Sequence, residues 1–124
     1  MMLETEVFQI EPDITGVSCA GRFTMGTRLS ETEALLNSLI WEGSRKLVID
    51  LTHVEFVDSA GLGVIMHVFG ELEQLGGKMR VAGPSGQALR LFRITHTGPI
   101  LSVDPDLVTS VKKLQAGEAD AAAT

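Results

Sequence analysis

The sequence is poor in cysteine and in positive charge, and each shortage limits what the protein can be. Its 124 residues contain one cysteine, Cys19, so no disulfide can form within the chain, which fits a reducing compartment. Lys and Arg number 10 against 16 Asp and Glu, and the formal net charge is −6 at pH 7. A protein that binds nucleic acid through its phosphates is usually basic, so this balance disfavours direct nucleic-acid binding.

The chain also lacks a long hydrophobic run and a secretory signal. No apolar run approaches the roughly 20 residues that cross a bilayer. The N-terminal stretch MMLETEVFQIEPD has no positively charged start followed by an apolar block, so it does not resemble a signal peptide. We therefore expect a cytoplasmic protein that does not insert into a membrane.

Motifs for acyl-enzyme chemistry are missing. The nucleophile elbow Gly-x-Ser-x-Gly needs a glycine on both sides of the serine, but Val57 stands two residues before Ser59. A catalytic triad also needs a base, and His53, His67 and His96 are better explained as solvated surface residues. We expect a protein that is not an enzyme.

Signals for a bound nucleotide or metal are weak. The stretch GLGVIM begins like a dinucleotide fingerprint but has Met66 in place of the third glycine, and no Gly-Lys-Ser/Thr phosphate loop occurs. Cys19 and the histidines show no paired zinc spacing. Asp50, Glu55 and Asp58 could gather near one strand end, but scattered acids are more often solvated or helix caps. The sequence predicts neither a metal nor a cofactor.

The chain does have a hydrophobic content of 44%, enough for the core of one compact domain. Strand and helix patterns alternate in the order β-β-α-β-α-β-α-β-α, which predicts an α/β fold with a mixed, mostly parallel sheet flanked by helices. The expected elements are a hairpin over residues 3–21, a helix over 29–43, a strand over 46–51, a helix that begins within 54–66 and runs to about 75, a strand over 78–82, a helix over 86–97, a strand over 99–103 and a helix over 104–114.

Capping residues mark the ends of several of these helices. Ser30 and Glu33 have capping-box spacing, and Gly43 ends the first helix. Asp104 is the expected N-cap of the last helix, with Pro105 at its first position. The helix residues expected to face the core are Leu29, Leu36, Leu39 and Ile40, then Leu62, Ile65, Met66, Phe69 and Leu72, then Leu89 and Phe92, and finally Leu107, Val108, Val111 and Leu114.

The stretch VEFVDSAGLGVIM, residues 54–66, places one serine at a helix start. The simplest interpretation makes Ser59 the N-cap of that helix. A hydroxyl there is also accessible to a modifying enzyme, and a phosphate would add about −1.5 to −2 charges. Backbone N–H groups and the positive helix end would hold that phosphate, while Asp58 would repel it. A cradle for a free anion at residues 60–63 is a third hypothesis.

Residues 45–98 closely resemble the STAS domain of bacterial anti-sigma factor antagonists, and LVIDLTHVEFVDSAGLGVI is the most specific part of the match. The resemblance extends more weakly from about Val7 to Leu114. It implies the element order given above and a single STAS-like domain over residues 1–114. We expect residues 115–124, which include no large apolar side chain, to be a disordered tail.

The resemblance also implies a function. In that family a serine is phosphorylated by a partner kinase that is itself the anti-sigma factor, and the matching residue is Ser59, within a motif formed by Asp58, Gly61, Leu62 and Gly63. The unmodified form would bind the serine kinase/anti-sigma factor, which then releases its sigma factor. The phosphorylated form would bind poorly until a serine phosphatase restores it.

The implied partner-binding surface combines that motif with the exposed side of the 62–75 helix and the loop at Met25 and Gly26. The chain departs from the family in two places: Thr24 replaces an acid that often flanks the phosphorylation site, and His96 replaces a glycine after the third helix. Thr24 keeps open the alternative of a constitutive STAS adaptor subunit of a transporter or stress-signalling complex. We expect a monomer or a weak dimer.

Overall fold

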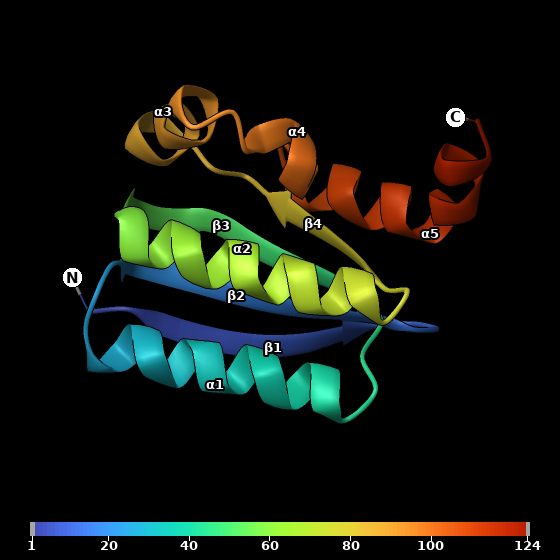
Figure 1. Cartoon of the computed structure of the whole chain (residues 1–124), viewed down its shortest axis with the longest axis horizontal. Coiled ribbons are helices and arrows are strands. Elements are labelled where there is room, and N and C mark those ends of the chain that lie inside the picture. Colours follow the sequence, from blue (N-terminus) through green and yellow to red (C-terminus); the bar gives the residue numbers. More distant parts are fainter. Residues whose placement is uncertain (1, 124) are drawn as a thin grey trace.

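A five-stranded sheet with helices on both of its faces forms the body of the protein in this computed structural model (Figure 1). The structure describes the backbone of residues 2–123 and the side chains of residues 2–116. The strands lie in the order β1-β2-β3-β4-β5, with β1 antiparallel to β2 and every other neighbouring pair parallel. This confirms the predicted mixed, mostly parallel sheet. The elements are β1 (Glu4–Ile10), β2 (Ile14–Phe23), α1 (Thr27–Trp41), β3 (Lys46–Val57), α2 (Ser59–Gln74), β4 (Lys78–Ala82), α3 (Gly86–Ile94), α4 (Gly98–Leu101), β5 (Val103–Asp104) and α5 (Leu107–Ala123).

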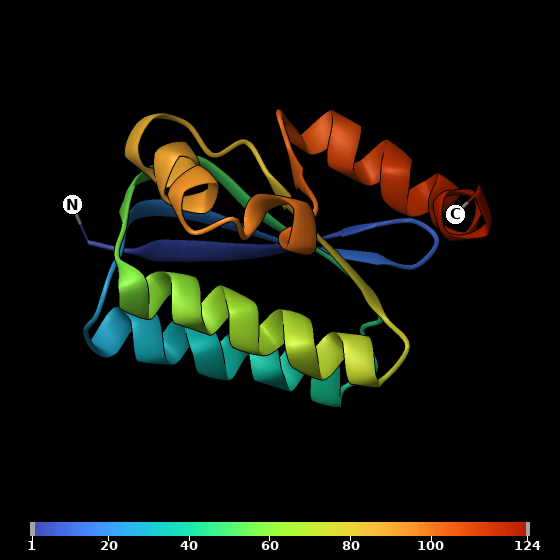
Figure 2. The same cartoon turned by 45° about the horizontal axis from the view of Figure 1, so that its top comes forward.

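The helices divide the core between the two faces of the sheet. Helices α1 and α2 lie together on one face and α5 lies on the other (Figure 2). The larger core cluster contains inward residues of α1, α2 and α3. Among them, Leu36, Ile65 and Phe92 are each no more than 1% exposed. The smaller cluster, on the α5 side, is centred on Ile14 and Val48.

Strand β3 is the centre of the sheet and it positions the candidate site. Residues 47–51 are buried, as expected for a strand covered on both faces. The strand then continues to Val57, beyond the predicted end at residue 51. Pairing with β4 stops where Asp50 meets Ala82, so the last part of β3 has β2 on one side only. In this last part only Val54 and Val57 are buried, and a register shift in the pairing with β2 between Val54 and Phe56 interrupts the regular alternation of a strand.

The predicted core face of α1 is confirmed, but its predicted start is wrong. Leu29, Leu36, Leu39 and Ile40 are all buried. The helix begins at Thr27 after Gly26, with no capping side chain, so Ser30 and Glu33 lie inside the helix and form no capping box at its start. Gly43 ends α1 as predicted, and Gly76 follows the end of α2 near the predicted residue 75. Both glycines come just after the C-caps and have positive φ, the backbone that terminates a helix.

The predicted strand over residues 99–103 is mostly wrong. Residues 98–101 form the short helix α4, and only Val103 and Asp104 pair with β4. Asp104 is therefore a strand residue and not the predicted N-cap. Asp106 takes the cap of α5, because its side chain accepts a hydrogen bond of 2.8 Å from the Thr109 N–H.

Buried Asp104 is instead the centre of an ionic contact between β4 and α5. Its carboxylate lies 2.6 Å from Arg80 Nε, and it accepts a 2.6 Å hydrogen bond from the Ser110 hydroxyl. Desolvation alone would raise the pKa of Asp104, but Arg80, Ser110 and Lys113 together hold this pKa below its ordinary value. On α5, Val108 is 63% exposed and so does not belong to the predicted inner face, whereas Leu114 is buried as predicted.

Helix α5 continues to Ala123, past the domain end predicted at residue 114. The side chains of residues 117–123, together with Met1 and Thr124, lie outside the described part of the chain. The predicted disorder of residues 115–124 therefore stays a prediction.

Candidate functional site

Helix α2 begins at the carboxyl end of β3, and Asp58 forms the corner between them. Its backbone is extended, and its side-chain Oδ1 accepts a 2.8 Å hydrogen bond from the Gly61 N–H. Asp58 is therefore the N-cap, and the interpretation of Ser59 as the cap is wrong. The physical reason is that Asp58 is the last non-helical residue, so its carboxylate can accept a hydrogen bond from a free N–H group of the first helical turn.

The same carboxylate fastens the neighbouring loop. Asp58 Oδ2 accepts a 2.9 Å hydrogen bond from the Met25 N–H, between β2 and α1. Partial desolvation acts to raise the pKa of Asp58, but backbone N–H groups, those of Met25 and Gly61 foremost, outweigh it and lower this pKa below its ordinary value. One ionised side chain thus holds together two segments that are far apart in the sequence.

Ser59 occupies the first position of α2 and is exposed. Within the described residues its hydroxyl makes no hydrogen bond, so Ser59 Oγ is not tied down by the fold. The free N–H groups of the first helical turn and the positive end of the helix dipole favour negative charge at this position. The ionised Asp58 next to it opposes that effect. Ser59 is thus exposed at a position where the helix dipole favours added negative charge and Asp58 disfavours it.

The two glycines of the motif have different roles. A methyl group on Gly61 would lie 2.1 Å from the backbone oxygen of Phe23, so glycine here lets α2 pack directly on the end of β2. A methyl group on Gly63 would meet nothing within 4 Å. Gly63 is also exposed, so its lack of a side chain serves no packing inside the fold.

The sequence-predicted partner-binding residues gather at one end of the molecule. Met25 is 79% exposed, and Gly26, Ser59 and Gly63 are also exposed. Asp58 and Leu62 are partly exposed. Gly61 is buried, so it shapes this surface from below and does not line it. We call the set Met25, Gly26, Asp58, Ser59, Leu62 and Gly63 the α2 start surface.

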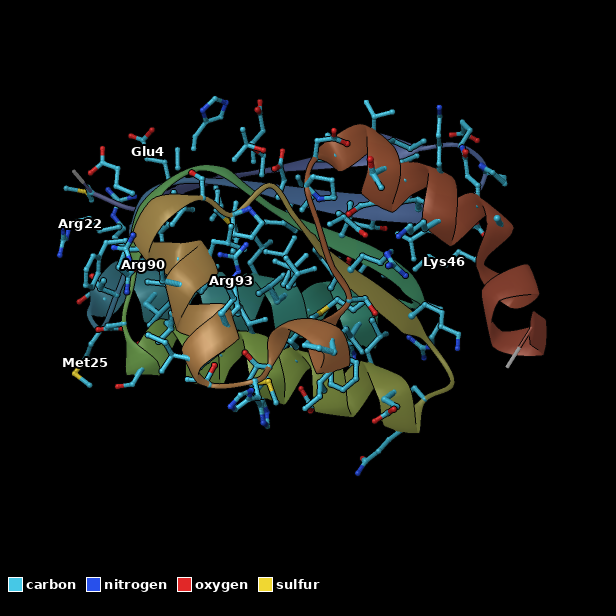
Figure 3. The ribbon with its side chains drawn as sticks, turned by 90° about the horizontal axis from the view of Figure 1, so that it is seen from above. Glu4, Arg22, Met25, Lys46, Arg90 and Arg93 are labelled. Atoms are coloured by element: carbon cyan, nitrogen blue, oxygen red, sulfur yellow. The ribbon has the colours of Figure 1, made fainter. Side chains whose placement is uncertain are left out.

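Two arginines extend the same end of the molecule. The Arg22 guanidinium lies 4.9 Å from the centre of the Phe56 ring, one residue before the end of β3. Figure 3 shows Arg22, Met25 and Arg90 at this end, with Lys46 at the other. Glu4 is labelled at this end as well, so this end of the molecule carries charges of both signs.

Gln87, which the sequence interpretation missed, holds the end of β3 in place. Its side-chain amide accepts a 2.9 Å hydrogen bond from the Val57 N–H and donates one of 2.8 Å to the Val57 carbonyl. These are the backbone groups that β4 would satisfy if it ran further. No sequence signal identifies Gln87, because its role depends on β4 ending at Ala82 and on where α3 lies.

The remaining chemistry predicted from the sequence is simple. Burial raises the pKa of the Cys19 thiol to about 12, with the charge of Asp50 adding to the effect, so Cys19 is an inert core residue. His67 is exposed on α2, 3.4 Å from Glu71. The described residues include no group of three or more His, Cys, Asp or Glu side chains that could hold a metal ion. In that same part of the chain, no helix combines the length and the apolar character that crossing a membrane requires.

The amino-acid sequence is similar to that of known proteins. The model of the STAS domain family matches residues 7–112. An anti-sigma-B factor antagonist of Listeria monocytogenes is 33% identical over 103 residues, which cover 83% of this chain and 90% of that protein.

Solved structures show the same fold. A crystal structure of an anti-sigma factor antagonist from Mycobacterium paratuberculosis superposes with a TM-score of 0.81 at 21% identity, covering 92% of this chain and 95% of the other. The phosphorylated form of the Bacillus cell fate determinant SpoIIAA gives a TM-score of 0.67 at 18% identity, covering 82% and 91%. The chain therefore belongs to the STAS-domain anti-sigma factor antagonist family.

Proposed function

We propose that the protein is a phosphorylation-controlled antagonist that binds an anti-sigma factor with serine kinase activity through the α2 start surface. Phosphorylation of Ser59 by that partner ends the binding, and a serine phosphatase restores it. The observation that carries the proposal is Ser59 itself, an exposed hydroxyl without a hydrogen bond in the described structure, at the start of a helix whose N-cap is the neighbouring carboxylate.

One phosphate on Ser59 should be enough to end binding, because of the charge that it adds beside Asp58. The phosphate places about −1.5 to −2 charges within one residue of the ionised Asp58. A partner surface that accepts Met25, Leu62 and the uncharged serine would then have to desolvate a dianion. A change of about 1.4 kcal/mol already lowers affinity tenfold, and removing an unpaired charge from water costs considerably more.

We expect the backbone around Ser59 to stay unchanged when Ser59 is phosphorylated. Asp58 already has its Met25 and Gly61 hydrogen bonds, and Ser59 contributes no side-chain hydrogen bond that phosphorylation would break. The two forms therefore differ in surface charge while sharing one backbone. The protein itself carries out no reaction in this scheme and serves as the substrate of its partners.

The test is incubation with ATP and candidate anti-sigma kinases, followed by peptide mapping. The expected label is on Ser59 and is lost in Ser59→Ala. Ser85→Ala is the matched control, because Ser85 is also an exposed serine at a helix start. Ser59→Asp should weaken the kinase complex at least tenfold. A stable complex with a transporter subunit or a scaffold protein that Ser59→Asp leaves unchanged would favour the constitutive adaptor instead.

A further inference from the structure

The only tryptophan of the chain, Trp41, is 90% exposed at the last position of α1. Tryptophan is usually largely buried, because its ring supplies more hydrophobic contact than almost any other side chain. The α2 start surface does not use Trp41: the ring lies by the far end of α2, and that helix is about 24 Å long at 1.5 Å per residue. The exposed ring therefore needs a separate explanation.

Trp41 borders a groove of about 800 Å³ at the place where α1 and α2 end. Figures 1 and 2 show the two helices side by side, with their C-terminal ends at the same end of the molecule. Ile40, Trp41 and Leu75 give the groove an apolar wall, and Leu75 is itself 52% exposed. A projecting ring and an apolar groove thus lie next to each other on one surface.

One residue that lines the groove has a buried hydrogen-bond acceptor without a donor. Asn37 lines it, and the side-chain oxygen of Asn37 is buried and has no hydrogen-bond partner in the described structure. Such an oxygen costs free energy until a donor reaches it. An indole N–H is a donor, and that of Trp41 has no acceptor among the described residues.

The charges in the groove are of both signs. Arg45 directs Nη1 to the carbonyl oxygens of Ile40 and Ser44, both at 2.9 Å, and its other guanidinium nitrogens have no partner in the described part of the chain. Glu71 lies 3.4 Å from His67 and is about half exposed. A strongly acidic or strongly basic partner would meet one charge of its own sign here. A second copy would bring Arg45 to Glu71 and Glu71 to Arg45.

We propose that two copies of this chain associate through the groove about a twofold axis, each placing Trp41 in the groove of the other. Such a contact pairs a projecting ring with an apolar groove and Arg45 with Glu71 on both sides of the axis, as an isologous interface requires. Because the contact lies at the far end of α2 from Ser59, both α2 start surfaces stay open in the dimer. This inference does not depend on the proposed function.

The test uses the intrinsic fluorescence of Trp41 together with sedimentation velocity, from dilute solution to about 1 mM protein, where an association with a millimolar Kd is well populated. The expected result is a dimer whose fraction rises with concentration, accompanied by a shift of Trp41 emission to shorter wavelength. A chain that stays monomeric with constant emission over the whole range overturns the proposal.

Variants distinguish this contact from any other. Trp41→Ser and Glu71→Arg should each raise the dimer Kd at least tenfold, and the double variant Arg45→Glu/Glu71→Arg should recover most of the loss caused by Glu71→Arg. Ile94→Ser is the matched control, because Ile94 is 74% exposed on α3 outside the groove. A dimer that survives Trp41→Ser, or that Ile94→Ser disrupts equally, would show that another surface is responsible.

Discussion

Replacing glycine by alanine separately at positions 61 and 63 should change stability in opposite directions. An alanine at an exposed position inside a helix is more stable than glycine by about 1 kcal/mol, because glycine loses more backbone entropy on folding. Position 63 offers open space to the new methyl group. Gly63→Ala should therefore raise the free energy of unfolding by about 1 kcal/mol, or the Tm by about 4 °C for a chain of this size.

Gly61→Ala should have the reverse effect. Its methyl group would lie 2.1 Å from the Phe23 carbonyl oxygen and 2.8 Å from the Phe23 ring, and the backbone atom cannot rotate away. Helix α2 would have to move off the end of β2, which breaks close packing at a buried contact and should cost about 3 kcal/mol. Urea unfolding of both variants measures the two changes.

The informative result is the effect of Gly63→Ala on the partner. If the α2 start surface binds the anti-sigma kinase, a methyl group that stabilises the protein should still weaken the complex about tenfold and slow the phosphorylation of Ser59. Gly70→Ala is the control, because a methyl group there also meets nothing within 4 Å but lies about 16 Å along the helix from Ser59. Equal binding by wild type and Gly63→Ala would refute the placement of the docking surface.

Three further predictions concern Gln87, Asp104 and His96. Gln87→Ala should lower the free energy of unfolding by about 2 kcal/mol, because it leaves buried backbone groups of Val57 without partners. Gln87→Glu should cost at least as much in the same urea titration, because a carboxylate oxygen would then face the Val57 carbonyl oxygen with no donor between them. The pKa of Asp104 is lowered in the folded state, so its contact with Arg80 should stabilise the protein above the unfolded pKa near 4 and be lost as pH falls through the folded pKa. Asp104→Asn should remove that part of the pH dependence of unfolding. His96 has a left-handed backbone with φ of 58°. His96→Gly should therefore raise the free energy of unfolding by about 1 kcal/mol, measured as a higher Tm, whereas His96→Ala should not.

The sequence predicted those parts of the fold that depend on local pattern. Helical periodicity located α1 with its correct inner face, and the uninterrupted apolar run identified the buried half of β3. Gly43 and Gly76 terminate helices because their positive φ is a property of the local backbone. His96 is related: the family position calls for glycine, and the structure shows the left-handed backbone that explains it.

Features that depend on tertiary contacts were not predictable in the same way. The run PILSV has strand-like composition, yet most of it forms α4, where Pro99 lies in the first turn, a position that proline favours. Asp104 looks like a cap by its position before Pro105, but Arg80 and Ser110 draw it into a buried contact. The inner face of α2 is centred on Val64, Ile65 and Val68, so the predicted stripe was rotated toward Leu62, Met66 and Phe69.

The candidate site was predictable to the same degree. The motif located Ser59 and its neighbours, and the structure assigns the cap to Asp58. The second role of Asp58, its hydrogen bond to Met25, depends on the parallel pairing of β2 with β3, which brings the two segments together. The role of Gln87 depends on where β4 ends and where α3 lies, and the groove beside Trp41 depends on where α1 and α2 end, so neither has a local signature.

The most direct test compares the unmodified and Ser59-phosphorylated proteins by amide NMR and by titration with the same anti-sigma kinase. Amide shifts confined to residues 22–26 and 57–63, together with a loss of affinity of at least tenfold, are the predicted result. Shifts throughout the sheet and both helical layers, or a phosphorylated form that binds as tightly as the unmodified one, would contradict a switch that acts through surface charge on a fixed scaffold.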